Sequence, residues 1–451
     1  MAQSGRVSTI TATFKLSTPA FIAGADNKQK AELRLPSVLG VLRFWWRALA
    51  WSATAGESEV QARLKKLREW EGELFGAAAS GDGKGGQGRF IARLVPPLPK
   101  AAPNPYERYL HKEPSRQQWT QGGWLKGSGR DYLAGQGLEG RSYLPAAQST
   151  FTVVFLRRPR LAEDHPEGAP RLEAAIQTMG LLGGIGARAR RGFGSLRLVR
   201  LLVDGQELTQ PADGTAYRAA LSSLLSEHVA PVDSPADVPY SAFSSLTRMA
   251  CVAGPSAAPD LHEEMGHRLQ YYRSYGQKIE ERGKELRIVG GRPKPQPFFG
   301  PDHRWLGSVL THFPSSSTPF SLGAPRRAVF GLPHNYFKRC EDGWNRTVHV
   351  TEPTTDRRAS PLFLHIHAFD EKKERPIAVW TLMKSTFLPS AQGALPDLAV
   401  KREESRGKGR EKEKTVFADW SVELQADFGA VEEFFTEQHL PGVIAIGPPA
   451  P

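Results

Sequence analysis

The sequence contains very little cysteine and no long apolar run. Cys251 and Cys340 are its two cysteines, too few for a zinc cluster or a disulfide framework, and such a chain fits a reducing cytoplasm. No run of 18 apolar residues occurs, and no charged segment followed by an apolar core opens the chain. We therefore expect a cytoplasmic protein without a transmembrane helix, a signal peptide or a membrane partner.

Familiar catalytic and metal-binding patterns are also missing. The sequence has neither GxSxG nor the P-loop pattern GxxxxGK[ST]. His262 and His267 are five residues apart and do not share a helix face, whereas His365 and His367 share a strand face but lack an evident third ligand. We predict no metal, no cofactor and no catalytic residue.

Acidic residues are outnumbered by basic ones. The chain has 59 Lys and Arg against 47 Asp and Glu, a formal net charge of +12. A surplus of this size favours a polyanionic partner, either nucleic acid or an anionic membrane surface.

Acids are absent from one stretch in particular, GGIGARARRGFGSLRLV from Gly183 to Val199. Apolar spacing predicts a helix over 172–182 before it, and alternation predicts a strand from Ser195 to Leu201. Glycines allow close backbone approach and positive φ, and arginines can donate two hydrogen bonds to one phosphate. The loop arginines are Arg188, Arg190 and Arg191. We interpret this glycine-arginine loop as a site for a polyanion.

Other interpretations of the loop compete with this one. Gly184-x-Gly186-x-x-Ala189 spells the dinucleotide fingerprint, but that motif requires strand, loop and helix in that order, and the order here is reversed. Gly183–Gly186 spells a GxxG clamp, which is too short to be specific. Arg191–Gly194 matches the opening of the RNP1 signature, but no aromatic residues follow where bases would stack. A glycine-rich turn with solvated arginines is the remaining alternative.

A helix is predicted from Pro36 to about Ser52. Val38, Leu42, Trp45 and Leu49 form its apolar stripe, and Gly40, Arg43 and Arg47 lie on another face. We predict that this second face and the glycine-arginine loop lie side by side on one RNA track, because arginines on two elements without an acid would otherwise repel one another. The alternatives are a solvated basic face and a glycine that allows tight helix packing.

Four tracts carry a resemblance to a known family. They are FIAGAD (Phe21–Asp26), ELRLPS (Glu32–Ser37), GVLRFWWR (Gly40–Arg47) and GGIGARARRGFGSL (Gly183–Leu196). Together they resemble the RAMP superfamily, the RNA-binding subunits of CRISPR effector complexes, and in particular the first RAMP subunit of the type III-B (Cmr) complex. The resemblance is clear over about 1–50 and 175–200, and it returns weakly at 328–333 and 357–363.

The resemblance implies a non-catalytic RNA-binding subunit that acts in antiviral defence. Such a subunit would contact the 3′ part of the guide RNA, the guide–target duplex and neighbouring RAMP subunits. The alternative is a metal-independent endoribonuclease that processes CRISPR repeat RNA, against which we note that no histidine lies in the loop. Asp26 occupies a loop comparable to one in which a related subunit has a cleavage-associated aspartate, but we expect turn chemistry there. The predicted RNA-binding residues are Gly24, Arg34, Gly40, Arg43, Arg47, Gly184, Gly186, Arg188, Arg190, Arg191, Arg327, Lys338, Arg357 and Arg358.

The element order of the first half predicts an α+β fold with helices on one face of an antiparallel sheet. A split βαβ, ferredoxin-like (RRM-like) unit is the closest simple motif, and the resemblance implies a second copy with long loop insertions. We place the domains at 1–205 and 239–451, with a linker at 206–238. In the second half we expect strands at 240–252, 361–369 and 377–387, helices at 216–229, 261–284 and 418–439, and a mobile solvated segment at 401–414.

Overall fold

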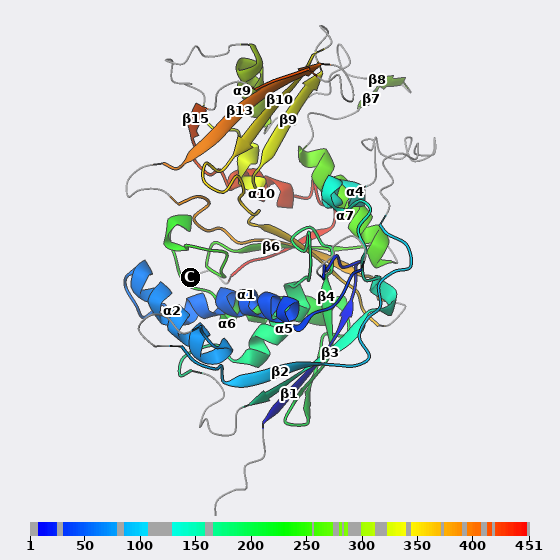
Figure 1. The fold of residues 1–451 in the computed structure, drawn as a ribbon, viewed down its shortest axis with the longest axis vertical. Coiled ribbons are helices and arrows are strands. Elements are labelled where there is room, and N and C mark those ends of the chain that lie inside the picture. The colour runs from blue at the N-terminus through cyan, green and yellow to red at the C-terminus, as the bar shows by residue number, and fades with distance from the viewer. Residues whose placement is uncertain are drawn as a thin grey trace, which may run out of the picture.

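The computed structural model stacks sheets and helices in alternating layers, with a sheet at each end and one in the middle (Figure 1). The predicted α+β class with antiparallel sheets is confirmed. The structure describes residues 8–24, 30–78, 85–106, 129–157, 166–254, 257–273, 279–281, 284–286, 299–311, 323–339, 344–370, 374–389, 395–406, 413–416 and 420–448.

The helices are α1 (Leu35–Ala53), α2 (Val60–Phe75), α4 (Gly129–Ala134), α5 (Leu172–Leu182), α6 (Gly214–Glu227), α7 (Ala258–Arg273), α9 (Gly300–Thr311) and α10 (Gly429–Glu432). The strands are β1 (Thr9–Leu16), β2 (Phe90–Val95), β3 (Thr150–Arg157), β4 (Leu196–Val203), β5 (Gln206–Leu208), β6 (Arg248–Ala253), β7 (Ile279–Glu281), β8 (Lys284–Leu286), β9 (His334–Arg339), β10 (Asn345–Thr351), β11 (Leu362–His367), β12 (Ile377–Leu382), β13 (Asp397–Arg406), β14 (Glu413–Val416), β15 (Trp420–Glu423) and β16 (Val443–Ile446).

The first sheet has the strand order β2-β3-β1-β4-β5 and is antiparallel throughout. Helix α1 begins with a proline in its first turn and buries the predicted stripe, including Val38, Leu42 and Leu49. Helix α5 packs so tightly on β4 that a Cβ on Gly180 would lie 2.4 Å from Cβ of Leu198. These helices join the first sheet to the middle sheet.

The middle sheet has the order β11-β12-β6-β16 and is covered on both faces. Cys251 on β6 faces the core shared with the first sheet, whereas its neighbour Ala250 faces the core shared with α7. Strands β11 and β12 are therefore buried along their whole length, as expected for a sheet between two helical layers. Numbered along the chain, both sheets place their first four strands in the order 2-3-1-4.

Two predictions for the second half are wrong. The charged segment 401–414 was expected to be mobile, but residues 401–406 belong to β13, which pairs with β10 and β14 in a third sheet. The predicted closing helix over 418–439 is instead β15, the short helix α10 and a 3-10 turn. In both places pairing within the third sheet overrides the local composition. β13 pairs with β15 through its first residues, among which Leu398 and Val400 are fully buried.

Residues 206–238, interpreted as a linker, contain β5 and α6. Tyr217 of α6 is fully buried, and its hydroxyl donates a hydrogen bond to the carbonyl of Leu181 in α5. Helix α6 is thus part of the core between the first and middle sheets, and the domain boundaries stay a prediction. Helix α7 ends at Arg273, earlier than expected, and β7 follows within the range predicted as helix.

Candidate nucleic-acid interface

The glycine-arginine loop, residues 183–195, runs along β11, the edge strand of the middle sheet. The amide of Leu364 donates to the carbonyl of Arg190 at 3.0 Å, and the amide of Ile366 donates to Oγ of Ser195 at 3.1 Å. Arg191 and Leu364 form a parallel β-bridge. The loop therefore satisfies backbone groups that an edge strand would otherwise leave unpaired.

Two buried histidines hold the two ends of this loop. His365 Nδ1 lies 2.9 Å from the carbonyl oxygen of Gly183, and His262 Nε2 lies 2.9 Å from that of Arg191. Because a carbonyl only accepts, each ring nitrogen must carry its proton. Burial lowers the pKa of both histidines to about 4, so both are neutral near pH 7.

Glycines allow the loop to make these close contacts. Gly192 has φ +79°, and a Cβ there would lie 2.9 Å from Nε2 of His262 and from Cδ2 of Leu364. Gly186 has φ +93°, and its Cβ would lie 2.6 Å from the carbonyl oxygen of Phe21. Side chains at these positions would strain the backbone and collide with their neighbours.

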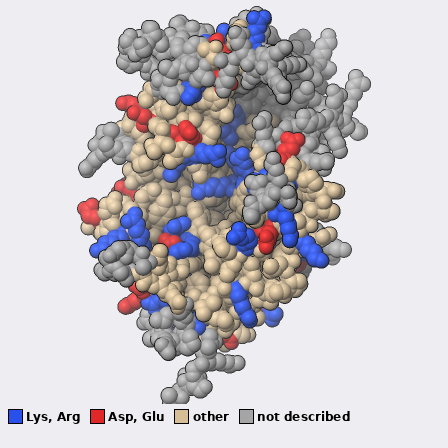
Figure 2. Space-filling view, viewed as in Figure 1, with Lys and Arg blue, Asp and Glu red and all other residues tan. Residues whose placement is uncertain are grey.

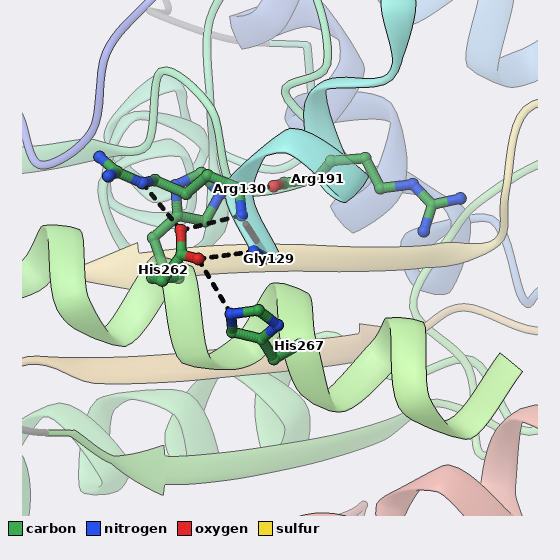
Figure 3. A network of polar contacts seen from close by, with 6 residues as sticks. Gly129, Arg130, Arg191, His262 and His267 are labelled. Carbon is green, nitrogen blue, oxygen red and sulfur yellow. Dashed lines mark hydrogen bonds and ion pairs between the residues drawn. The ribbon is translucent and has the colours of Figure 1, made fainter. Parts of the chain in front are cut away.

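Glu263, which follows His262 in α7, connects α7 to α4 by hydrogen bonds (Figure 3). Its carboxylate accepts from the amides of Gly129 (2.6 Å) and Arg130 (3.1 Å) and pairs with Nε2 of His267 (3.0 Å). Burial raises the pKa of Glu263, but these hydrogen bonds outweigh it and lower the pKa to about 2. Figure 3 shows the guanidinium of Arg191 pointing away from these residues, so Glu263 does not neutralise the charge of Arg191.

Six arginines gather around the loop, and we call them the arginine cluster. They are Arg188, Arg190, Arg191, Arg273, Arg357 and Arg358. Burial and the charge of Arg358 lower the pKa of Arg190 to about 10, and burial and Arg273 do the same for Arg191. Among the described residues, no carboxylate forms an ion pair with any of the six. Like charges at close range without counter-charges attract an anion.

In space-filling view, Lys and Arg side chains gather around a hollow in the middle of one face (Figure 2). The sequence pattern did not indicate Arg273 of the arginine cluster or its neighbour His334. Arg273 Nη2 lies 3.3 Å from Nδ1 of His334, and burial together with Arg273, Arg327 and Arg191 holds the pKa of His334 well below its usual value. Both residues join the loop only through tertiary folding, so a local motif could not have revealed them.

The loop and α1 meet at a cavity of about 380 Å³, which Arg47 and Arg190 both line. The guanidinium of Arg190 lies 5.7 Å from the ring centroid of Phe44 on α1. Arg43 instead pairs with Glu71 of α2 at 3.0 Å, and Glu71 also lies 3.6 Å from Arg47. The basic face of α1 is therefore accompanied by an acid that the local pattern did not include.

Gly40 is exposed, and a Cβ placed on it would meet nothing within 4 Å. The alternative that Gly40 allows tight helix packing is therefore wrong.

The remaining predicted residues lie in different surroundings. Arg34 is exposed just before α1, Gly24 and Gly184 are half-buried, and Arg357 is exposed beside Arg188. The side chain of Arg327 is 2% exposed and faces Asp302 at 3.9 Å and the ring of Phe299 at 4.5 Å. Lys338 lies on β9, but its side chain is outside the described residues, as is Asp26.

Within the described ranges, no group of three His, Cys, Asp or Glu side chains could hold a metal ion. Nor does any helix in those ranges have the length and apolarity needed to cross a membrane.

Comparison with known proteins finds one family model that matches part of the chain. Residues 13–197 match the family model of the RAMP superfamily, so the resemblance read from the sequence is confirmed there. No curated protein matches the chain.

Among solved structures, Cmr1 from Pyrococcus furiosus in its apo form is similar, with 14% identity, 97% of this chain and 99% of that chain covered, and a TM-score of 0.47. A chain of the type III-B Cmr-beta complex bound to cognate target RNA has 10% identity and a TM-score of 0.42, covering 85% of this chain and 97% of its own. A chain of that complex with target RNA and AMPPnP, in the presence of ssDNA, has 10% identity and a TM-score of 0.44, covering 86% and 96%.

Proposed function

We propose that this protein is a non-catalytic RNA-binding subunit of a type III-B CRISPR ribonucleoprotein in antiviral defence. Its partners would be the 3′ part of the guide RNA, the guide–target duplex and the other RAMP subunits of the complex. The observation that carries the proposal is the arginine cluster, whose charges have no carboxylate partners among the described residues and surround the glycine-arginine loop. The RAMP-superfamily match over residues 13–197 supports the same assignment.

Phosphate contacts from such a cluster supply affinity but little sequence preference. Replacing Arg188, Arg191 and Arg357 together by alanine should weaken binding about equally for unrelated RNA sequences. It should also reduce the slope of log affinity against log salt by roughly one unit, at most, for each lost phosphate contact. Filter binding or fluorescence anisotropy across a salt series would measure both effects.

Arg200→Ala is a matched control for this experiment. Arg200 is an exposed arginine on β4 that pairs with Glu207 at 3.2 Å, away from the cluster. An unchanged slope in the triple variant, or an equal change in the Arg200→Ala protein, would overturn the proposed phosphate site.

The alternative of an endoribonuclease would need a histidine or a tyrosine near the loop. His262 contacts the loop but is fully buried, and its Nε2 is occupied by the carbonyl of Arg191. His334 is only half-buried and faces the arginine cluster, so it is the histidine to test. We expect no discrete cleavage of CRISPR repeat RNA or of target RNA by the purified chain, with or without a chelator.

Repeat cleavage that is lost in a His334→Ala variant would replace the binding proposal with the nuclease. Target cleavage that is lost in an Asp26→Ala variant would contradict the non-catalytic role in a different way.

A further inference from the structure

We propose that the cavity between α1, α2 and the arginine cluster holds a single nucleotide, an unstacked base together with its phosphate. Where that nucleotide belongs to an RNA chain, this inference rests on the proposed RNA-binding function. A free mononucleotide has the same chemistry and is the other source to be tested.

The cavity has the size and walls of a small-molecule site. Its volume of about 380 Å³ is within the range of about 300–1,000 Å³ typical of ligand pockets. Helix α1 contributes Phe44 and Arg47, helix α2 contributes Arg68 and Glu71, and the glycine-arginine loop contributes Arg190. A cavity of this kind can enclose one nucleotide but not a double helix.

The charges of the cavity favour a phosphate. Arg47, Arg68, Arg190 and Arg358 line it, and Glu71 is the acid among its lining residues. Arg43, which does not line the cavity, pairs with Glu71 at 3.0 Å and offsets its charge. Arg47 also lies 3.6 Å from Glu71, so the other three guanidinium groups of the cavity have no carboxylate partner among the described residues.

Two of these guanidinium groups are held in place before any ligand arrives. Arg190 donates to the carbonyl of Ser360, and Arg358 Nη2 donates to the carbonyl of Thr386 at 2.7 Å. The fixed geometry of these two guanidinium groups reduces the entropy lost when a phosphate binds.

Flat groups beside these charges favour a base. The guanidinium of Arg190 lies 4.3 Å from the ring centroid of Phe363 and 5.7 Å from that of Phe44. Phe44 and Tyr240 are only half-buried and line the cavity, and the Tyr240 hydroxyl donates to the carbonyl of Arg47 at 3.0 Å. Unstacked bases bind to aromatic rings and guanidinium planes in this way.

The test uses short single-stranded RNA, the same RNA with one abasic nucleotide at each position in turn, and AMP. Phe44→Leu keeps an apolar side chain but removes the ring. It should weaken binding of the intact RNA about 5- to 150-fold, the range expected for one stacked base. The RNA whose abasic position falls in the cavity should bind the Phe44→Leu and unchanged proteins equally well. Phe44→Tyr should restore binding, and equal melting temperatures would show that the fold is intact.

Arg68→Ala, at an exposed residue of the cavity rim, should lower affinity for intact and abasic RNA alike. AMP binding that depends on Phe44, with RNA binding unaffected, would identify a free nucleotide as the source. Normal RNA and AMP binding in both Phe44→Leu and Arg68→Ala would overturn the cavity assignment. The proposed function would nevertheless stand if the triple variant of the arginine cluster binds RNA more weakly than the unchanged protein. Failure of the triple variant to weaken binding would instead remove the proposed function.

Discussion

At the scale of single residues, Gly40 shows a helix position that packing does not explain. The residue is exposed in the interior of α1, and a Cβ there would contact nothing. Glycine at such a position costs about 1 kcal/mol relative to alanine. A partner that lies close to the backbone is a reason for glycine that this geometry still allows.

Gly40→Ala should therefore raise the free energy of unfolding by up to about 1 kcal/mol, measured by urea or thermal denaturation. Gly40→Leu should not lower stability, because leucine is also a better helix former than glycine, but it should lower RNA affinity, because its side chain would occupy the space next to the backbone. A lower melting temperature in the alanine variant would show that Gly40 serves the fold rather than a ligand.

At the scale of elements, the contact between α4 and α7 depends on one carboxylate. Glu263 accepts from two backbone amides at the start of α4 and from His267 on its own helix. Hydrogen bonds to a charged group contribute about 1.5–3 kcal/mol each at most, and the buried amides would lose their acceptor. Glu263→Ala should lower the free energy of unfolding by roughly 2–4 kcal/mol.

The neighbouring Glu264 is the matched control for that measurement. It pairs with Arg268 one turn further along α7 and is more exposed than Glu263. Glu264→Ala should cost no more than about 0.5 kcal/mol, as is usual for surface pairs at this spacing. Equal losses in the two variants would mean that Glu263 is not a specific connection between the helices.

The elements also show what the sequence could predict. Helices α1 and α5 and the loop after α5 were predicted within a few residues, because apolar spacing, Pro36 and glycines are local signals. β13 was missed because its residues are highly charged, and only pairing with β10 and β14 makes it a strand. Arg273 and Arg191 come together through the packing of α7 on the middle sheet, and no spacing rule contains that information.

At the scale of the whole molecule, the attachment of the glycine-arginine loop to α7 and β11 should weaken in acid. His262 and His365 have a folded pKa of about 4, below the usual value of 6.5 for a free histidine. Their contribution to stability is complete above pH 6.5 and is lost as the pH falls toward 4, because the unfolded chain binds these protons more readily. Each histidine accounts for roughly 3 kcal/mol at most, from the size of its shift.

Denaturant titrations at pH 7.5, 6 and 5 would measure this loss. A His262→Gln variant keeps a hydrogen-bond donor but does not titrate, so its stability should vary less with pH in this window. Stability that stays constant or rises between pH 7.5 and 5 would contradict the neutral state of these histidines.

The attachment of the glycine-arginine loop to β11 also sets the order of events during synthesis. A ribosome makes residues 183–195 long before it makes residues 362–367, yet the loop hydrogen-bonds to Leu364 and Ile366 and is held by His365. A nascent chain that ends before β11 has the arginines but not the strand that fixes their backbone. The loop gains this part of its support only after translation has passed β11, so an incomplete chain holds the loop through its remaining contacts, including those with residues 18–21.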